Sequence, residues 1–160
     1  MRSYKKMVKI LFVCHGNICR SPMAEFIMRD LAERSGYGDE IFTASAATST
    51  EEIGNPVHGG TERVLRRLGI SCAGKHAVQM TKRDYRDYDF LIGMDDWNLR
   101  NMRRIVGGDP DGKLFRLLDF TSSPHEVADP WYTGDFETTY HDVKEGCEAL
   151  LNYLIHEGRV

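Results

Sequence analysis

The sequence has few cysteines and no long apolar run, and each of these shortages argues against one class of protein. Its 160 residues include four irregularly spaced cysteines, which are Cys14, Cys19, Cys72 and Cys147. Four cysteines are too few for a disulfide framework in a chain of this length, so reduced thiols and a cytoplasmic location are expected. No apolar run approaches the roughly 20 residues that a membrane-spanning helix needs, so no membrane insertion is expected.

The chain also lacks an excess of charge of either sign. It has 21 basic and 24 acidic residues, and its formal net charge at pH 7 is −3. Without a broad basic field, nucleic acid is not expected as a partner. Any positive potential must be local, which suits a small anionic ligand. The length fits one domain over residues 1–160, large enough to bury roughly 70% of its unfolded surface.

The sequence does contain a regular alternation of two apolar patterns. Runs rich in apolar and β-branched residues predict strands at 7–14, 40–48, 90–94 and 113–120. Helical spacing predicts helices at 21–36, 55–70, 81–89, 95–106 and 136–156, with a long polar loop at 121–135. Ser21 and Gly36 are expected to cap and to end the first helix. This alternation predicts a three-layer α/β fold, in which helices cover both faces of a four-stranded parallel sheet.

Each polar cluster noted in the chain follows one of the expected strands. The clusters cover residues 14–21, 45–52, 94–97 and 119–135. In open α/β sheets, ligands bind outside the carboxyl ends of the strands. The four clusters are therefore expected to converge on one edge of the sheet.

The first cluster lies in the stretch VCHGNICRSP (13–22), which offers ligands for a metal ion. Cys14, His15 and Cys19 lie close together, and Cys72 and His76 are available elsewhere in the chain. Zinc sites, however, usually combine a closely spaced cysteine pair with a second pair of ligands. Because the sequence does not follow that pattern, no metal is expected.

The same stretch agrees better with an anion pocket around a reactive thiolate. A glycine-bearing loop from a strand to a helix turns backbone N–H groups inward, and the helix dipole adds partial positive charge. Five residues separate Cys14 from Arg20, so one turn of loop brings the guanidinium back over the sulfur. There its planar fork can hold two oxygens of a tetrahedral dianion. This combination is typical of a nucleophile that attacks phosphate.

Several motifs together resemble the low-molecular-weight protein tyrosine phosphatase family, from about Met7 to the final helix. They are VCHGNICRSPMAE (13–25), SAAT (45–48), IGNP (53–56), KHAVQMT (75–81), MDDWN (94–98) and ADPWYTGDFETTY (128–140). The resemblance implies a flavodoxin-like sheet and a single phosphatase domain over residues 1–160 that needs no cofactor. It also implies that phosphotyrosine-containing proteins or peptides are the substrates and that inorganic phosphate is the product.

The resemblance assigns three catalytic roles. Cys14 is expected to be the nucleophile and Arg20 the clamp for the phosphate and the transition state. Asp129 is expected to protonate the phenolate leaving group and later to activate water against the phosphocysteine. The phosphate-binding loop implied by the motif consists of His15, Gly16, Asn17, Ile18, Cys19, Arg20 and Ser21.

The resemblance also implies a supporting network around this loop. Its expected members, which hold the loop in a strained shape, are Asn17, Ser21, Ser45 and His76. Asp95 either steadies the loop from the third strand or caps the following helix. Cys19 either traps the oxidised nucleophile as a disulfide or is a small residue packed in the loop.

The sequence departs from the family pattern at the substrate rim. Glu51, followed by Glu52, occupies the position of an aromatic residue that usually stacks on the substrate, while Trp131 and Tyr132 still supply an aromatic wall. Two carboxylates predict a preference for phosphopeptides with basic or neutral flanks. Ile18 stands where a phosphoarginine-specific branch carries threonine, and it favours phosphotyrosine.

Two other classes of function compete with this interpretation. Arsenate reductases share the fold and the loop, but they need further cysteines around the third strand, and residues 81–112 contain none. A phosphopeptide-binding module without activity would need neither a thiolate nor an acid. The presence of Cys14, Arg20 and Asp129 together argues for an enzyme.

Overall fold

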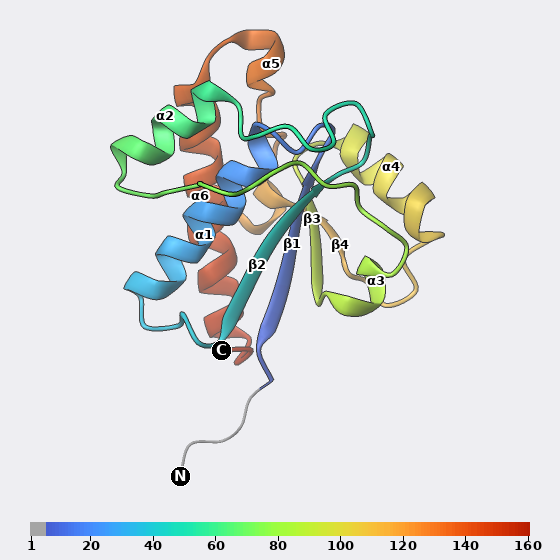
Figure 1. Ribbon diagram of the computed structural model, residues 1–160. Coiled ribbons are helices and arrows are strands. Elements are labelled where there is room, and N and C mark those ends of the chain that lie inside the picture. Colours follow the sequence, from blue (N-terminus) through green and yellow to red (C-terminus); the bar gives the residue numbers. More distant parts are fainter. Residues whose placement is uncertain (1–5) are drawn as a thin grey trace.

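The computed structural model describes residues 6–160 and contains one parallel sheet. The strands are β1 (Val8–Cys14), β2 (Ile41–Ala47), β3 (Phe90–Gly93) and β4 (Leu114–Arg116), in the order β2-β1-β3-β4 (Figure 1). The chain moves outward from β1 to β2 and then returns to the other side of β1. Such a reversal creates a crevice at the carboxyl ends of β1 and β3, where α/β proteins bind ligands.

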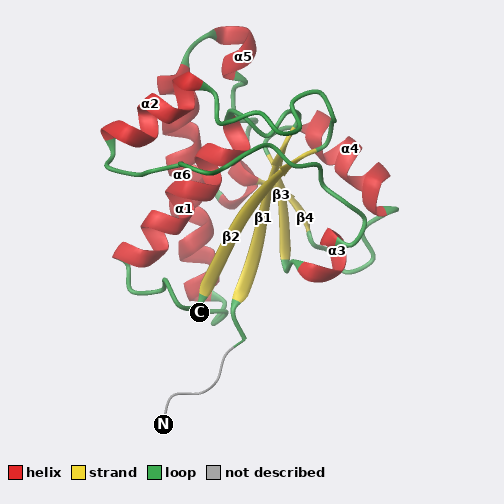
Figure 2. Ribbon diagram, in the orientation of Figure 1, coloured by secondary structure: helices red, strands yellow, loops and turns green. Residues whose placement is uncertain are grey.

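Helices cover both faces of the sheet (Figure 2). Three of them, α1 (Arg20–Arg34), α2 (Gly59–Arg67) and α6 (Phe136–His156), lie on one side. On the other side lie α3 (Asp84–Asp87) and α4 (Asp96–Val106). The expected three-layer α/β architecture with a four-stranded parallel sheet is confirmed.

The central strand β1 contributes to the core on both faces. Alternate residues of a strand point to opposite sides of its sheet. Accordingly, Ile10, Phe12 and Cys14 pack with residues of α1 and α6, whereas Leu11 and Val13 pack with residues of α4. Cys14 therefore leaves the sheet on the side where α1 begins.

The fourth strand is shorter than the sequence predicts. A strand was expected over 113–120, but β4 ends at Arg116 and a 3₁₀ helix, η1, follows at Leu117–Phe120. Leu117 and Leu118 are both fully buried in the same core cluster, which alternate faces of a strand do not allow. Leu117 packs directly against Gly146 of α6, where an added Cβ would lie 2.4 Å from its Cγ.

Other boundaries also differ from the sequence prediction. The helix expected at 55–70 begins only at Gly59, because Pro56 pairs as an isolated bridge and His58 caps the helix. The helix expected at 81–89 covers only α3. Within the polar loop 121–135, a short helix α5 spans Pro130–Thr133. The first helix starts at Arg20, and Ser21 does not cap it.

Candidate active site

Cys14 is buried at the mouth of β1 and faces the start of α1. Its Sγ lies 3.0 Å from the Ser21 hydroxyl, and the backbone N–H of Ser21 donates to it at 3.4 Å. Both groups belong to the first turn of a 15-residue helix, whose N-terminus carries partial positive charge. The Ser21 side chain therefore contacts the sulfur of Cys14 instead of capping the helix.

Asn17 holds the loop between Cys14 and α1 in its shape. It is buried and has a φ of 59°, a left-handed conformation that asparagine tolerates better than most residues. Its side-chain amide donates to the hydroxyls of Ser21 at 2.8 Å and Ser45 at 3.0 Å, and its Oδ1 accepts the Val78 N–H at 3.1 Å. These three contacts offset the cost of the strained backbone.

A partly buried ion pair of Glu25 with Arg29 and Lys75 lies below this layer and was not predicted from the sequence. The Ser45 hydroxyl donates to Glu25 Oε1 at 2.6 Å, and Arg29 donates to Glu25 Oε2 at 2.7 Å. Lys75 Nζ donates to the backbone oxygen of Ser45 at 2.8 Å and lies 3.6 Å from Glu25 Oε1. Burial lowers the pKa of Lys75, and the charge of Glu25 opposes that shift. The ion pair thus supports Ser45, and through it Asn17.

His76 is not brought into the network, contrary to the expectation from the motif. Its side chain is exposed, and its Nδ1 lies 3.1 Å from the backbone oxygen of Gly74. The preceding residue, Lys75, points inward instead. Neighbouring residues of an extended segment face opposite sides, so an inward Lys75 directs His76 to solvent. Both residues lie within the motif KHAVQMT (75–81), and this motif alone does not determine which of the two side chains faces inward.

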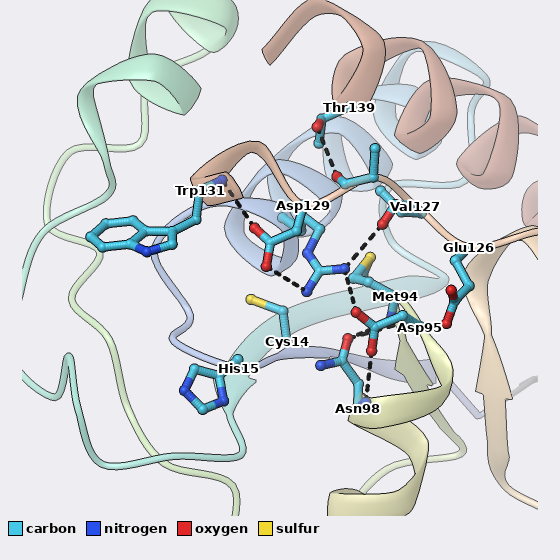
Figure 3. Close-up of polar contacts among 12 residues, drawn as sticks. Cys14, His15, Met94, Asp95, Asn98, Glu126, Val127, Asp129, Trp131 and Thr139 are labelled. Atoms are coloured by element: carbon cyan, nitrogen blue, oxygen red, sulfur yellow. Dashed lines mark hydrogen bonds and ion pairs between the residues drawn. The ribbon is translucent and has the colours of Figure 1, made fainter. Parts of the chain in front are cut away.

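Arg20 connects the loop to two other segments, whose residues Asp95 and Asp129 are labelled in Figure 3. Its buried guanidinium donates to Asp95 Oδ2 at 2.8 Å, to the Val127 oxygen at 3.0 Å and to Asp129 Oδ2 at 3.3 Å. Burial acts to lower the pKa of Arg20, but the charges of Cys14, Asp95 and Asp129 outweigh it, so the pKa is raised. The guanidinium therefore stays charged beside the sulfur.

The two carboxylates that bind Arg20 also begin helices. Asp95 Oδ1 accepts the N–H of Asn98 at 2.7 Å and caps α4, while its Oδ2 accepts from Arg20. Asp129 Oδ1 accepts the N–H of Trp131 at 3.0 Å and caps α5. Each carboxylate is thus fixed by its own helix while its second oxygen faces Arg20 (Figure 3).

A cavity of about 600 Å³ opens above Cys14 and Arg20. The expected rim residues Glu51, Glu52, Trp131 and Tyr132 line it, together with His15, Gly16, Ile18 and Cys19 of the loop. His15 Nε2 lies 2.9 Å from Glu51 Oε2 at the exposed edge. Trp97 of α4, which is not among the site residues predicted from the sequence, also lines the cavity. The cavity therefore brings the sulfur of Cys14, the cation of Arg20 and the carboxylate of Asp129 to one open space.

Cys72 and Cys147 lie apart from this cavity, whereas Cys19 lines it. All four cysteines are free, and Cys147 is fully buried in the core, which raises the pKa of its thiol. Within residues 6–160, no group of three or more His, Cys, Asp or Glu side chains is placed to hold a metal ion. No helix in the same range is long and apolar enough to cross a membrane.

Comparisons with known proteins agree on one family. Residues 9–160 match the family described as low molecular weight phosphotyrosine protein phosphatase. The chain is 46% identical to the low molecular weight protein-tyrosine-phosphatase YfkJ of Bacillus subtilis, over 91% of this chain and 94% of that protein. It is 36% identical to PtpA of Staphylococcus epidermidis, a protein with the same description, over 96% of this chain and 98% of that one.

Solved structures are similar as well. The crystal structure of YfkJ from Bacillus subtilis superposes with a TM-score of 0.93 at 43% identity, covering 97% of this chain and 99% of that one. The SP-PTP structure from Streptococcus pyogenes, a low molecular weight protein tyrosine phosphatase, gives a TM-score of 0.83 at 40% identity, covering 92% and 93%.

Proposed function

This chain belongs to the low molecular weight phosphotyrosine protein phosphatase family and is a cysteine-dependent protein tyrosine phosphatase, and we propose that Cys14, Arg20 and Asp129 carry out its reaction. One observation supports this assignment above all others. Arg20, in the loop that follows Cys14, donates to Asp129, so the proposed nucleophile, clamp and acid share one cavity. Asp129 lies 109 positions from Arg20 in the chain.

In the first step the Cys14 thiolate attacks the phosphorus of phosphotyrosine. A sulfur–phosphorus bond forms while the bond to the tyrosine oxygen breaks. The Arg20 guanidinium holds two phosphoryl oxygens in the bidentate geometry that arginine favours. Asp129 gives its proton to the departing phenolate oxygen, which makes tyrosine a neutral leaving group.

In the second step water attacks the phosphocysteine. Asp129, now ionised, takes a proton from that water as general base. The phosphorus–sulfur bond breaks and inorganic phosphate leaves. The hydroxyl and N–H of Ser21 stabilise the thiolate that is released, because both already face Sγ.

We also propose the substrates of the enzyme, its location in the cell and the extent of its domain. The substrates are phosphotyrosine-containing proteins or peptides, and the carboxylates of Glu51 and Glu52 at the rim favour basic or neutral flanks. Free cysteines support a cytoplasmic location. Residues 1–160 form one phosphatase domain, of which residues 1–5 lie outside the described part.

The function is tested directly by hydrolysis of p-nitrophenyl phosphate and of a phosphotyrosine peptide with EDTA present. Turnover of both is expected, since no step needs a metal ion. Arsenate reduction and release of phosphate from phosphoarginine are expected to be far slower. Dominant activity in either of these assays would favour the corresponding alternative instead.

Cys19 is expected to protect Cys14 during oxidation. Burial and, to a smaller extent, the charge of Cys14 raise the pKa of Cys19 to about 12, so Cys19 stays a thiol at neutral pH. Peroxide converts the Cys14 thiolate to a sulfenic acid, and condensation with the Cys19 thiol then forms a disulfide and releases water. We expect Cys19→Ser to recover several-fold less activity than wild type after peroxide treatment and reduction by dithiothreitol.

The matched control for this experiment is Cys72→Ser, a half-exposed cysteine outside the loop. It is expected to recover like wild type. Equal recovery of Cys19→Ser and wild type would instead assign Cys19 the packing role.

Lys75 is expected to position the loop for catalysis. In Lys75→Met the Ser45 backbone oxygen loses its donor and Glu25 loses one of its two cations. We expect a fall in kcat on the order of 10- to 100-fold, because small misplacements of reacting groups are costly. Binding of inorganic phosphate as a competitive inhibitor should change less, since Arg20 is untouched.

A merely structural role for Lys75 would give a different result. Lys75→Arg keeps the charge and is expected to recover part of the lost kcat. Lys82→Met removes an exposed lysine nearby and serves as control. If Lys75→Met lowered only the melting temperature and left kcat unchanged, Lys75 would not be a positioning residue.

A further inference from the structure

Trp97 lies at the edge of the active-site cavity and has no part in the reaction derived above. Its indole lines the cavity, yet 55% of the residue is exposed, so it does not contribute to the hydrophobic core. It is one of the two tryptophans of the chain, and both line this cavity. Exposed aromatic side chains beside a binding cavity are typical of ligand contacts.

The backbone under Trp97 is rigid and tied to the phosphate clamp. Trp97 is in the first turn of α4, whose capping box joins Asp95 and Asn98. Asn98 is fully buried and its Oδ1 also accepts the N–H of Met94 at 3.0 Å. Because Asp95 binds Arg20 at 2.8 Å, the first turn of α4 has a fixed position relative to the phosphate site.

The indole also has a cation above its ring. The Arg100 guanidinium lies over the ring of Trp97, 5.5 Å from its centroid, one turn further along α4. Such a cation–π contact favours one orientation of the indole. Less conformational freedom is then lost when a ligand binds against it.

The rim is therefore asymmetric. Glu51 and Glu52 follow β2, Cys14 ends β1, and Trp97 follows β3, while β1 lies between β2 and β3 in the sheet. The carboxylates and the indole thus stand on opposite sides of the Cys14 pocket. One side of the rim suits a cationic or neutral group, and the other offers an apolar surface.

We propose that Trp97 is a specificity-determining residue that binds an apolar or aromatic side chain next to the phosphotyrosine of a peptide substrate. Its exposure places the indole at the mouth of the cavity, above the floor where Cys14 and Arg20 are buried. A neighbouring residue of the peptide therefore reaches the indole while the phosphate reaches Arg20. This assignment rests on the proposed phosphatase function.

The test compares two phosphotyrosine peptides that differ only in one residue beside the phosphotyrosine, phenylalanine or glycine. Both the preceding and the following position are examined. Wild type is expected to prefer the phenylalanine peptide at one of them, with kcat/KM higher on the order of 10-fold, the scale of apolar discrimination by enzymes. In Trp97→Ala this ratio is expected to fall to about one.

The control variant is Phe42→Ala, which removes an aromatic residue that is 42% exposed and lies on the outer strand β2. It is expected to keep the wild-type ratio. A wild-type ratio near one at both positions, or an unchanged ratio in Trp97→Ala, would overturn the proposal. Hydrolysis of p-nitrophenyl phosphate by wild type separates this result from a failure of the phosphatase function itself, because that substrate has no neighbouring residue.

Discussion

Cys14→Ser is expected to reduce hydrolysis of p-nitrophenyl phosphate to the background rate. A serine hydroxyl at this position stays protonated, and in the described part of the chain its nearest partner is Ser21, which is no general base. No phosphoenzyme can then form at a useful rate. Removal of the nucleophile from a serine hydrolase lowers kcat roughly 10⁶-fold, and a loss of that order is expected here. Steady-state kinetics with purified variant and wild type measure it.

Two further measurements distinguish lost chemistry from lost folding. The Cys14→Ser variant retains Arg20 and the N-terminus of α1, so it should still bind inorganic phosphate and phosphotyrosine peptides. Cys72→Ser, at a cysteine outside the loop, should keep the wild-type rate. Appreciable turnover by Cys14→Ser would rule out the phosphocysteine mechanism. Arsenate reduction and metal binding would then be the next properties to measure.

Asp129→Asn has the second largest expected effect, a fall in kcat of about 10²- to 10⁴-fold. An asparagine amide cannot protonate the leaving group or take a proton from water. It can still accept the Trp131 N–H and cap α5, so the loop should keep its conformation. The loss should therefore appear in catalysis rather than in thermal stability.

The choice of substrate makes this prediction specific. Aryl phosphates with poorer leaving groups depend more on proton donation. The fall in kcat/KM caused by Asp129→Asn should therefore be larger for phenyl phosphate than for p-nitrophenyl phosphate. Asp135→Asn is a matched control, since Asp135 caps α6, accepts the Thr138 hydroxyl and does not line the cavity, and asparagine caps equally well. A defect of the same size with every leaving group would show that Asp129 is not the acid of the first step.

The parts of the site that lie close together in the chain were predictable from the sequence. The spacing between Cys14 and Arg20 lies within one strand-loop-helix unit, so backbone geometry alone brings the two side chains together. The alternation of strand and helix patterns likewise predicted the parallel sheet. It failed at 113–120, because burial of Leu117 and Leu118 against α6 depends on a helix that starts 16 residues after η1 ends.

By itself, the sequence determined the fold class, and it predicted the nucleophile, the clamp and, through its motif, the acid. Only the tertiary structure decided which side chains of extended segments face inward. A shift of one residue reverses the direction of every side chain in such a segment, so Lys75 and not His76 supports Ser45. The tertiary structure also decided which residues bind Arg20, since these partners are 75 to 109 positions away. It likewise decided that Trp97 lies in the cavity wall. Contacts at such distances depend on how the layers pack, and packing is a property of the whole chain.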